Sequence, residues 1–164
     1  MKQNPNNAIS PYSILRAVLV AVFAAILLFS QLSSKDSDTP IEEVASQVLS
    51  AISTESMQES NSRMLKKLYD LDADSFDGVV LYTPVTNMDV TELLIVRLSS
   101  DEQAEAVTEA ANSRLETQKN SFEGYGAEQT ALLNAAVLEV RGNYVLYVVH
   151  PDAPAAQQAF LDSL

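Results

Sequence analysis

The sequence of 164 residues contains no cysteine, no tryptophan and a single histidine, His150. Without cysteine the chain can form no disulfide scaffold and no cysteine-ligated zinc cluster, and it has neither a thiol nucleophile nor a cysteine for lipid attachment. A serine–histidine–aspartate triad would have to use His150. Positive charge is also scarce, because ten Lys and Arg residues stand against 22 Asp and Glu residues, for a net charge of −12. This balance argues against nucleic acid as a partner, since nucleic-acid binding needs clustered Lys and Arg.

The clearest feature near the N-terminus is an apolar run. Residues 14–32 include thirteen consecutive apolar residues. At about 1.5 Å per residue, a helix over this run is about 28 Å long, close to the ~30 Å hydrocarbon core of a bilayer. Lys2 and Arg16 lie before the apolar stretch and acidic residues follow it. The positive-inside rule therefore predicts that residues 1–13 form a cytoplasmic tail and that the rest of the chain is outside the cell membrane.

A cleaved signal peptide is the main alternative for this run, because a thirteen-residue apolar stretch also fits the hydrophobic region of such a peptide. A buried core helix is a third interpretation. Residues 28–34 contain no A-x-A cleavage motif, which favours a retained transmembrane anchor over a secreted protein. Residues 33–40 are predicted to be a polar tether, and residues 41–164 a single extracytoplasmic domain with seven basic and 20 acidic residues, for a net charge of −13.

Hydrophobic periodicity and capping signals predict an α+β domain after the tether. The predicted helices cover residues 41–52, 62–69, 101–121, 127–135 and 155–164. The predicted strands cover residues 79–82, 93–98, 137–141 and 144–149, with a tight Gly-Asn turn between the last two. Thr39 is predicted to cap the first helix with Pro40 at its first position, and residues 54–62 are expected to be loose. The expected architecture is a roughly four-stranded, mostly antiparallel sheet packed against one long helix.

One group of polar and aromatic residues is the candidate binding site: Arg114, Gln118, Phe122, Tyr125 and Gln129. The first three are spaced four apart, so they share one face of the long helix, and the other two follow its end. A guanidinium, two amides and a phenol can bind a carboxylate, a peptide or a saccharide. The alternative is structural: Arg114 and Gln118 hydrogen-bond the glycine turn and the carbonyls at the helix end, while Phe122 and Tyr125 join the core.

The acidic stretch Asp70, Asp72 and Asp74 has the spacing of the first ligands of a calcium loop. Ser75 and Leu81 occupy the positions where such a loop needs a glycine and a bidentate Glu. The stretch is therefore interpreted as a solvated loop in which Asp side chains cap turns, and no metal site is assigned.

No catalytic motif is visible, because the sequence has no glycine-rich phosphate loop, no G-x-S-x-G and no H-E-x-x-H. His150 has no partner pattern and is interpreted as a loop residue. Tyr82, Tyr144 and Tyr147 alternate with aliphatic residues and are interpreted as core or sheet surface. No catalytic residue and no cofactor is assigned, although the many acids leave an unidentified pair of carboxylates open.

Two stretches carry a family resemblance, RLETQKNSFEGYG at residues 114–126 and VRGNYV at residues 140–145. They resemble an uncharacterised bacterial family, a domain of unknown function found mainly in Firmicutes, and the resemblance extends over about residues 60–150. Members of that family look like small exported proteins with an N-terminal anchor or a lipoprotein signal. A chain without cysteine would use the transmembrane form of anchoring. The resemblance implies a location and a bacterial source, and it implies no activity, substrate or catalytic residue.

These observations predict a non-enzymatic, membrane-tethered extracytoplasmic domain, held by residues 14–32, that binds an envelope protein or a cell-wall component. The first alternative is an extracytoplasmic hydrolase that acts on a peptide or saccharide through unidentified carboxylates, and the second is a self-associating module. A deep cleft with two converging carboxylates would favour the enzyme, and an exposed patch around Tyr125 would favour binding.

Overall fold

A five-stranded antiparallel sheet organises the computed structural model, which describes residues 36–164. The strands lie in the order β1-β2-β3-β5-β4. Their bounds are Met57–Ser60 (β1), Gly78–Pro84 (β2), Glu92–Arg97 (β3), Val137–Arg141 (β4) and Tyr144–Val149 (β5). The helices are α2 (Ile41–Ser50), α3 (Ser62–Tyr69), α4 (Gln103–Phe122), α5 (Ala127–Asn134) and α6 (Ala153–Ser163), with a short 3-10 turn η1 (Ala73–Ser75).

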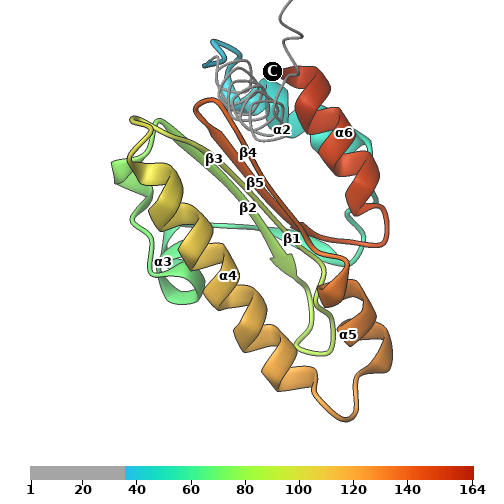
Figure 1. The fold of residues 1–164 in the computed structure, drawn as a ribbon. Coiled ribbons are helices and arrows are strands. Elements are labelled where there is room, and N and C mark those ends of the chain that lie inside the picture. Colours follow the sequence, from blue (N-terminus) through green and yellow to red (C-terminus); the bar gives the residue numbers. More distant parts are fainter. Residues whose placement is uncertain (1–35) are drawn as a thin grey trace, which may run out of the picture. The chain divides into compact units, whose positions relative to one another are not determined.

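Helices cover both faces of the sheet (Figure 1). Helices α2 and α6 pack on one face, and α3, α4 and α5 pack on the other. Side chains alternate along a strand, so central strand β3 contributes Leu93 and Ile95 to the first core cluster and Leu94 and Val96 to the second. All four are fully buried. The α+β class is confirmed, and the sheet is sandwiched rather than covered on one face by the long helix alone.

Several predicted elements are confirmed at or near their expected bounds. Helix α3 and the β4–β5 hairpin have the predicted ends, and α5 and α4 differ by one or two residues. Gly142 has a φ of +52°, which fits the tight primed turn expected for a two-residue hairpin loop.

The four-strand prediction is wrong because it missed β1. The sequence Met-Gln-Glu-Ser has one apolar side chain, Met57, so it lacks the alternation that marks a half-buried strand. Strand β1 forms because β2 offers a free edge, and its residues pair antiparallel with Leu81–Pro84. Cross-strand pairing thus overrides a weak local preference.

The start of α2 also differs from the prediction. Pro40 is the N-cap and makes no side-chain capping bond, whereas Thr39 turns its hydroxyl away and donates to the Ser163 carbonyl over 3.0 Å. The residues before it are held by the turn between β4 and β5: the Ser37 amide donates to Asn143 Oδ1 over 2.9 Å, and Asn143 Nδ2 donates to the Ser37 carbonyl over 3.2 Å. The Tyr144 hydroxyl donates to the Thr39 carbonyl over 2.6 Å. The chain therefore enters the fold at the Arg97 end of strand β3, because the Asn143 carbonyl accepts from the Leu98 amide.

Within residues 36–164, none of the helices combines the length and the apolar composition needed to cross a membrane. The predicted anchor at residues 14–32 and the predicted tail at residues 1–13 lie outside the described residues.

Candidate functional site

A buried carboxylate lies at the start of the central strand. Glu92 is the first residue of β3 and is 0% exposed. It lies on the same strand face as Leu94 and Val96, so its side chain points toward α4 rather than toward solvent. Burying an ionised carboxylate is costly unless it is paired and hydrogen-bonded. The residues around Glu92 therefore determine whether its buried charge is compensated.

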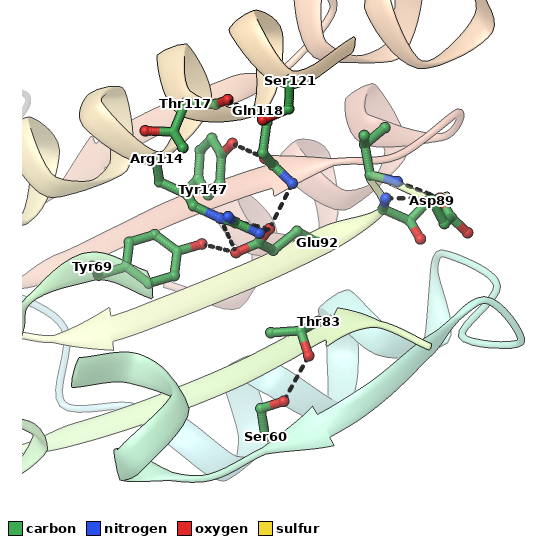
Figure 2. Close-up of polar contacts among 12 residues, drawn as sticks. Ser60, Tyr69, Thr83, Asp89, Glu92, Arg114, Thr117, Gln118, Ser121 and Tyr147 are labelled. Atoms are coloured by element: carbon green, nitrogen blue, oxygen red, sulfur yellow. Dashed lines mark hydrogen bonds and ion pairs between the residues drawn. The ribbon is translucent and has the colours of Figure 1, made fainter. Parts of the chain in front are cut away.

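Three side chains from two helices converge on Glu92 (Figure 2). Arg114 Nη2 lies 2.9 Å from Oε2, and Arg114 Nε lies 3.2 Å from each carboxylate oxygen. Gln118 Nε2 donates to Oε2 over 3.1 Å, and the Tyr69 hydroxyl donates to Oε1 over 2.5 Å. The Tyr147 hydroxyl donates to Gln118 Oε1 over 3.5 Å and so fixes the orientation of that amide. We call these five residues the Glu92 network.

The electrostatics of the Glu92 network keep Arg114 charged and its tyrosines neutral. Burial alone lowers the pKa of Arg114, but the hydrogen bonds and the charge of Glu92 outweigh it, and the net pKa is raised. Burial raises the pKa of Tyr69 well above its usual value, and the adjacent Glu92 charge raises it further. Burial also raises the pKa of Tyr147. Both phenols therefore act as hydrogen-bond donors at neutral pH.

The structure brings the predicted candidate group together only in part. Arg114 and Gln118 point inward to Glu92, not to the glycine turn, and Phe122 is buried in the core. Tyr125 lies beside Phe122 with ring centroids 5.7 Å apart, and its hydroxyl donates to a carbonyl in the last turn of α4. Its ring is exposed, so it does not join the core as the structural alternative expected. Gln129 Nε2 instead donates to the Met88 carbonyl in the β2–β3 loop over 3.0 Å.

Sequence reasoning missed Glu92 and Tyr69. Glu92 precedes an apolar run and lies just outside the predicted strand, at a position where a charged residue is normally exposed to solvent. The available signal was its register, because it alternates with Leu94 and Val96 and therefore falls on a buried face. Tyr69 ends helix α3, and nothing local links it to a residue 23 positions later.

A cleft of about 380 Å³ opens beside the Glu92 network. Its walls come from α4, from α3, and from the end of β2 with the loop that follows it. Arg114, Gln118 and Phe122 all line it. The uncharged polar lining residues are Gln58, Thr83, Thr86, Asn87, Gln118 and Ser121, and the apolar ones are Met64, Leu68, Pro84, Val85 and Phe122.

The charged groups of the cleft are already engaged. Arg114 is paired with Glu92. Asp89 Oδ1 accepts from the amides of Val90 and Thr91 over 2.6 and 3.0 Å, which holds the β2–β3 loop in place. The cleft therefore offers hydroxyls, amides and apolar surface, a combination suited to recognising an uncharged polar group next to an apolar one.

His150 lies in the loop between β5 and α6, as interpreted, but it is buried and has hydrogen-bond partners that the sequence pattern does not reveal. Its Nδ1 accepts from the Asp152 amide over 2.9 Å, and its Nε2 lies 3.0 Å from the Ser53 carbonyl. Both ring nitrogens thus contact backbone, which makes His150 a structural residue that joins the end of β5 to the segment after α2.

The acidic stretch forms local turns. Asp72 Oδ1 accepts from the Asp74 amide over 3.2 Å, and the Asp70 carboxylate lies 2.6 Å from Lys66 Nζ. This ion pair and its hydrogen bond lower the pKa of Asp70. No group of three or more His, Asp or Glu side chains among residues 36–164 is arranged to hold a metal ion.

Comparison with known proteins places the chain in a family without a described activity. No curated protein and no solved structure matches it. A family model described as a domain of unknown function (DUF4358) matches residues 50–150. That range covers more than half of the chain and contains the whole Glu92 network and the cleft beside it. The chain therefore belongs to the DUF4358 family.

Proposed function

We propose that this protein is a membrane-tethered, extracytoplasmic binding domain of the bacterial envelope, and that the cleft beside the Glu92 network is its binding site. The observation that carries this proposal is the cleft itself, a cavity of about 380 Å³ with uncharged polar walls and an apolar flank. Its size and mixed lining are those of sites that hold a small molecule or a short segment of a partner.

The Glu92 network supports this role because it fixes one wall of the cleft. Arg114 and Gln118 line the cleft and are anchored to β3 through Glu92. Asp89 and Gln129 hold the facing β2–β3 loop. Walls that are already ordered lose less conformational entropy when a ligand binds.

The hydrolase alternative needs two converging carboxylates. Among the described residues that line the cleft, Asp89 is the one acid, and its Oδ1 accepts two backbone amides. Glu92 lies behind Arg114 and Gln118 and is fully buried. This arrangement supports binding over hydrolysis.

The location rests on the sequence. The length and apolarity of residues 14–32 and the basic residues before them support an anchor with the domain outside. A protease added to intact cells should therefore digest the domain, and protection of the domain until the cells are lysed would contradict the proposed topology.

Photo-crosslinking in the full chain, expressed in bacterial membranes, tests the site. A benzoylphenylalanine that replaces Thr86 or Asn87, both exposed at the edge of the cleft, should form a covalent adduct with the bound partner on irradiation. The same group at Ala155, exposed on α6 on the other face of the sheet, should not.

A cleft-filling variant supplies the specificity control. Ser121→Trp places an indole in the cleft from an exposed position of α4 and should abolish the adduct, whereas Ser113→Trp, also exposed on α4 but outside the cleft lining, should not. Equal adducts at all three positions, or adducts that survive Ser121→Trp, would refute the assignment of the cleft.

A further inference from the structure

Three large apolar side chains are exposed at one end of the domain. Val85 and Met88, in the β2–β3 loop, are 53% and 66% exposed, and Tyr125, in the α4–α5 turn, is 69% exposed. Within the described residues one further large apolar side chain is exposed, Val140 on β4, but less so, at 42%. Figure 1 shows that the β2–β3 loop and the α4–α5 turn lie at the same end of the sheet. We call Val85, Met88 and Tyr125 the apolar rim.

The apolar rim is continuous with the cleft. The bond from Gln129 to the Met88 carbonyl brings the β2–β3 loop against α5. Val85 and Phe122 line the cleft, and Phe122 contacts the Tyr125 ring. Phe122 and Tyr125 also line a second hollow of about 280 Å³ under the turn. An occupant can therefore run from the cleft across Phe122 to Tyr125.

This shape and composition favour a polypeptide over a small molecule. Exposed apolar side chains that gather in one place mark interaction sites, and Met and Tyr are enriched in protein interfaces. Two neighbouring hollows separated by the buried ring of Phe122 suit successive side chains of a segment rather than one compact ligand.

The acidic side chains around the apolar rim favour a positively charged partner. Glu123 and Glu128 flank Tyr125 in sequence and are exposed. Arg114 in the cleft is paired with Glu92, and Lys119 on α4 lies 3.4 Å from Glu116. The net charge of −12 for the chain opposes docking of a second copy and favours an approaching cation.

We propose that the apolar rim docks a cationic polypeptide segment whose apolar anchor side chain enters the hollows beside Phe122. This names the partner class of the cleft and so rests on the proposed binding function. The acids around the rim steer and select the segment, and Val85, Met88 and Tyr125 provide the apolar contact.

The test uses the full chain in nonionic detergent and fluorescence anisotropy of a labelled synthetic peptide in which Lys and Arg flank a Leu-Phe pair. We expect this peptide to bind, and we expect the double substitution Met88→Ser and Tyr125→Ser to weaken its affinity at least tenfold. The matched control is Val140→Ser, which removes an exposed apolar side chain outside the rim. A peptide with Glu in place of the basic residues and one with Ser in place of Leu-Phe should both bind at least tenfold more weakly.

Equal binding by the acidic peptide, or unchanged affinity in the double variant, overturns the partner class. A dimer in sedimentation velocity that the double variant dissociates overturns it in favour of a second copy. If the basic peptide fails while Thr86 still forms adducts that Ser121→Trp removes, the partner class is wrong and the cleft function stands. If those adducts are missing as well, both proposals fail.

Discussion

At the scale of single residues, Glu92 is the position on which the site depends. Its carboxylate is fully buried and accepts hydrogen bonds from donors on α3 and α4. A buried ion pair adds little net stability compared with a well-packed apolar pair, but removing one partner is strongly destabilising because a charge remains buried without compensation. The Glu92 network is thus sensitive to change at each member.

Arg114→Met should destabilise the protein by about 3–5 kcal/mol, because it leaves Glu92 buried without its cation. Adding Glu92→Gln to this variant removes the uncompensated charge and should recover part of the loss. Urea unfolding followed by circular dichroism measures both. An Arg114→Met variant as stable as the parent chain would show that the ion pair does not hold α4 to the sheet.

The decrease in the free energy of unfolding at alkaline pH should depend on Tyr69. Its pKa is raised in the folded state, whereas in the unfolded chain it titrates near 10. Above about pH 10 the unfolded state therefore loses the proton first, and stability falls as the pH rises toward the folded pKa. Tyr69→Phe should make this fall shallower by up to about 1.4 kcal/mol per pH unit. An identical slope for both proteins in unfolding titrations from pH 9 to 11 would contradict the assignment.

At the scale of elements, the sequence predicts well where local pattern and tertiary pairing agree. Helix α3 and the β4–β5 hairpin have strong internal signals, apolar residues at helical spacing and a Gly-Asn turn between β-branched and aromatic runs. Strand β1 has no such signal and exists through its partner β2. The sequence predicts only the α4 side of the site, because Arg114 and Gln118 share a helix face. Glu92 and Tyr69 join them through contacts between residues more than 20 positions apart in sequence.

Asn143→Ala tests how the hairpin turn holds the entering chain. The substitution removes both hydrogen bonds to Ser37 and should cost about 1–2 kcal/mol. Hydrogen exchange of the amides of residues 37–39 should accelerate, while exchange in α4 stays unchanged. Asn112→Ala, exposed on α4, is the matched control and should alter neither. Unchanged exchange at residues 37–39 in Asn143→Ala would show that other contacts hold this segment.

At the scale of the whole molecule, the dominant property is excess negative charge. The 22 acids of the chain all fall within residues 36–164, against seven bases in the same range. Self-repulsion of this kind destabilises the compact state and is screened by salt. The urea midpoint should therefore rise as NaCl is increased from about 10 to about 200 mM. A midpoint that falls over this range would mean that attractive ion pairs outweigh the repulsion.

The segment that leads into the domain and the cleft lie at opposite ends of the sheet. Ser37 is clasped at the Arg97 end of β3, and the cleft lies at the Glu92 end, about 17 Å away at about 3.4 Å per residue. Tension between a tether at the first end and a partner held at the second would act along the strands. Hydrogen bonds between antiparallel strands are perpendicular to that direction. Such a pull would therefore act on all the hydrogen bonds of a strand pair at once, in shear, and would not break them one after another. The direction of the strands is thus the direction in which a pull between Ser37 and an occupant of the cleft would act.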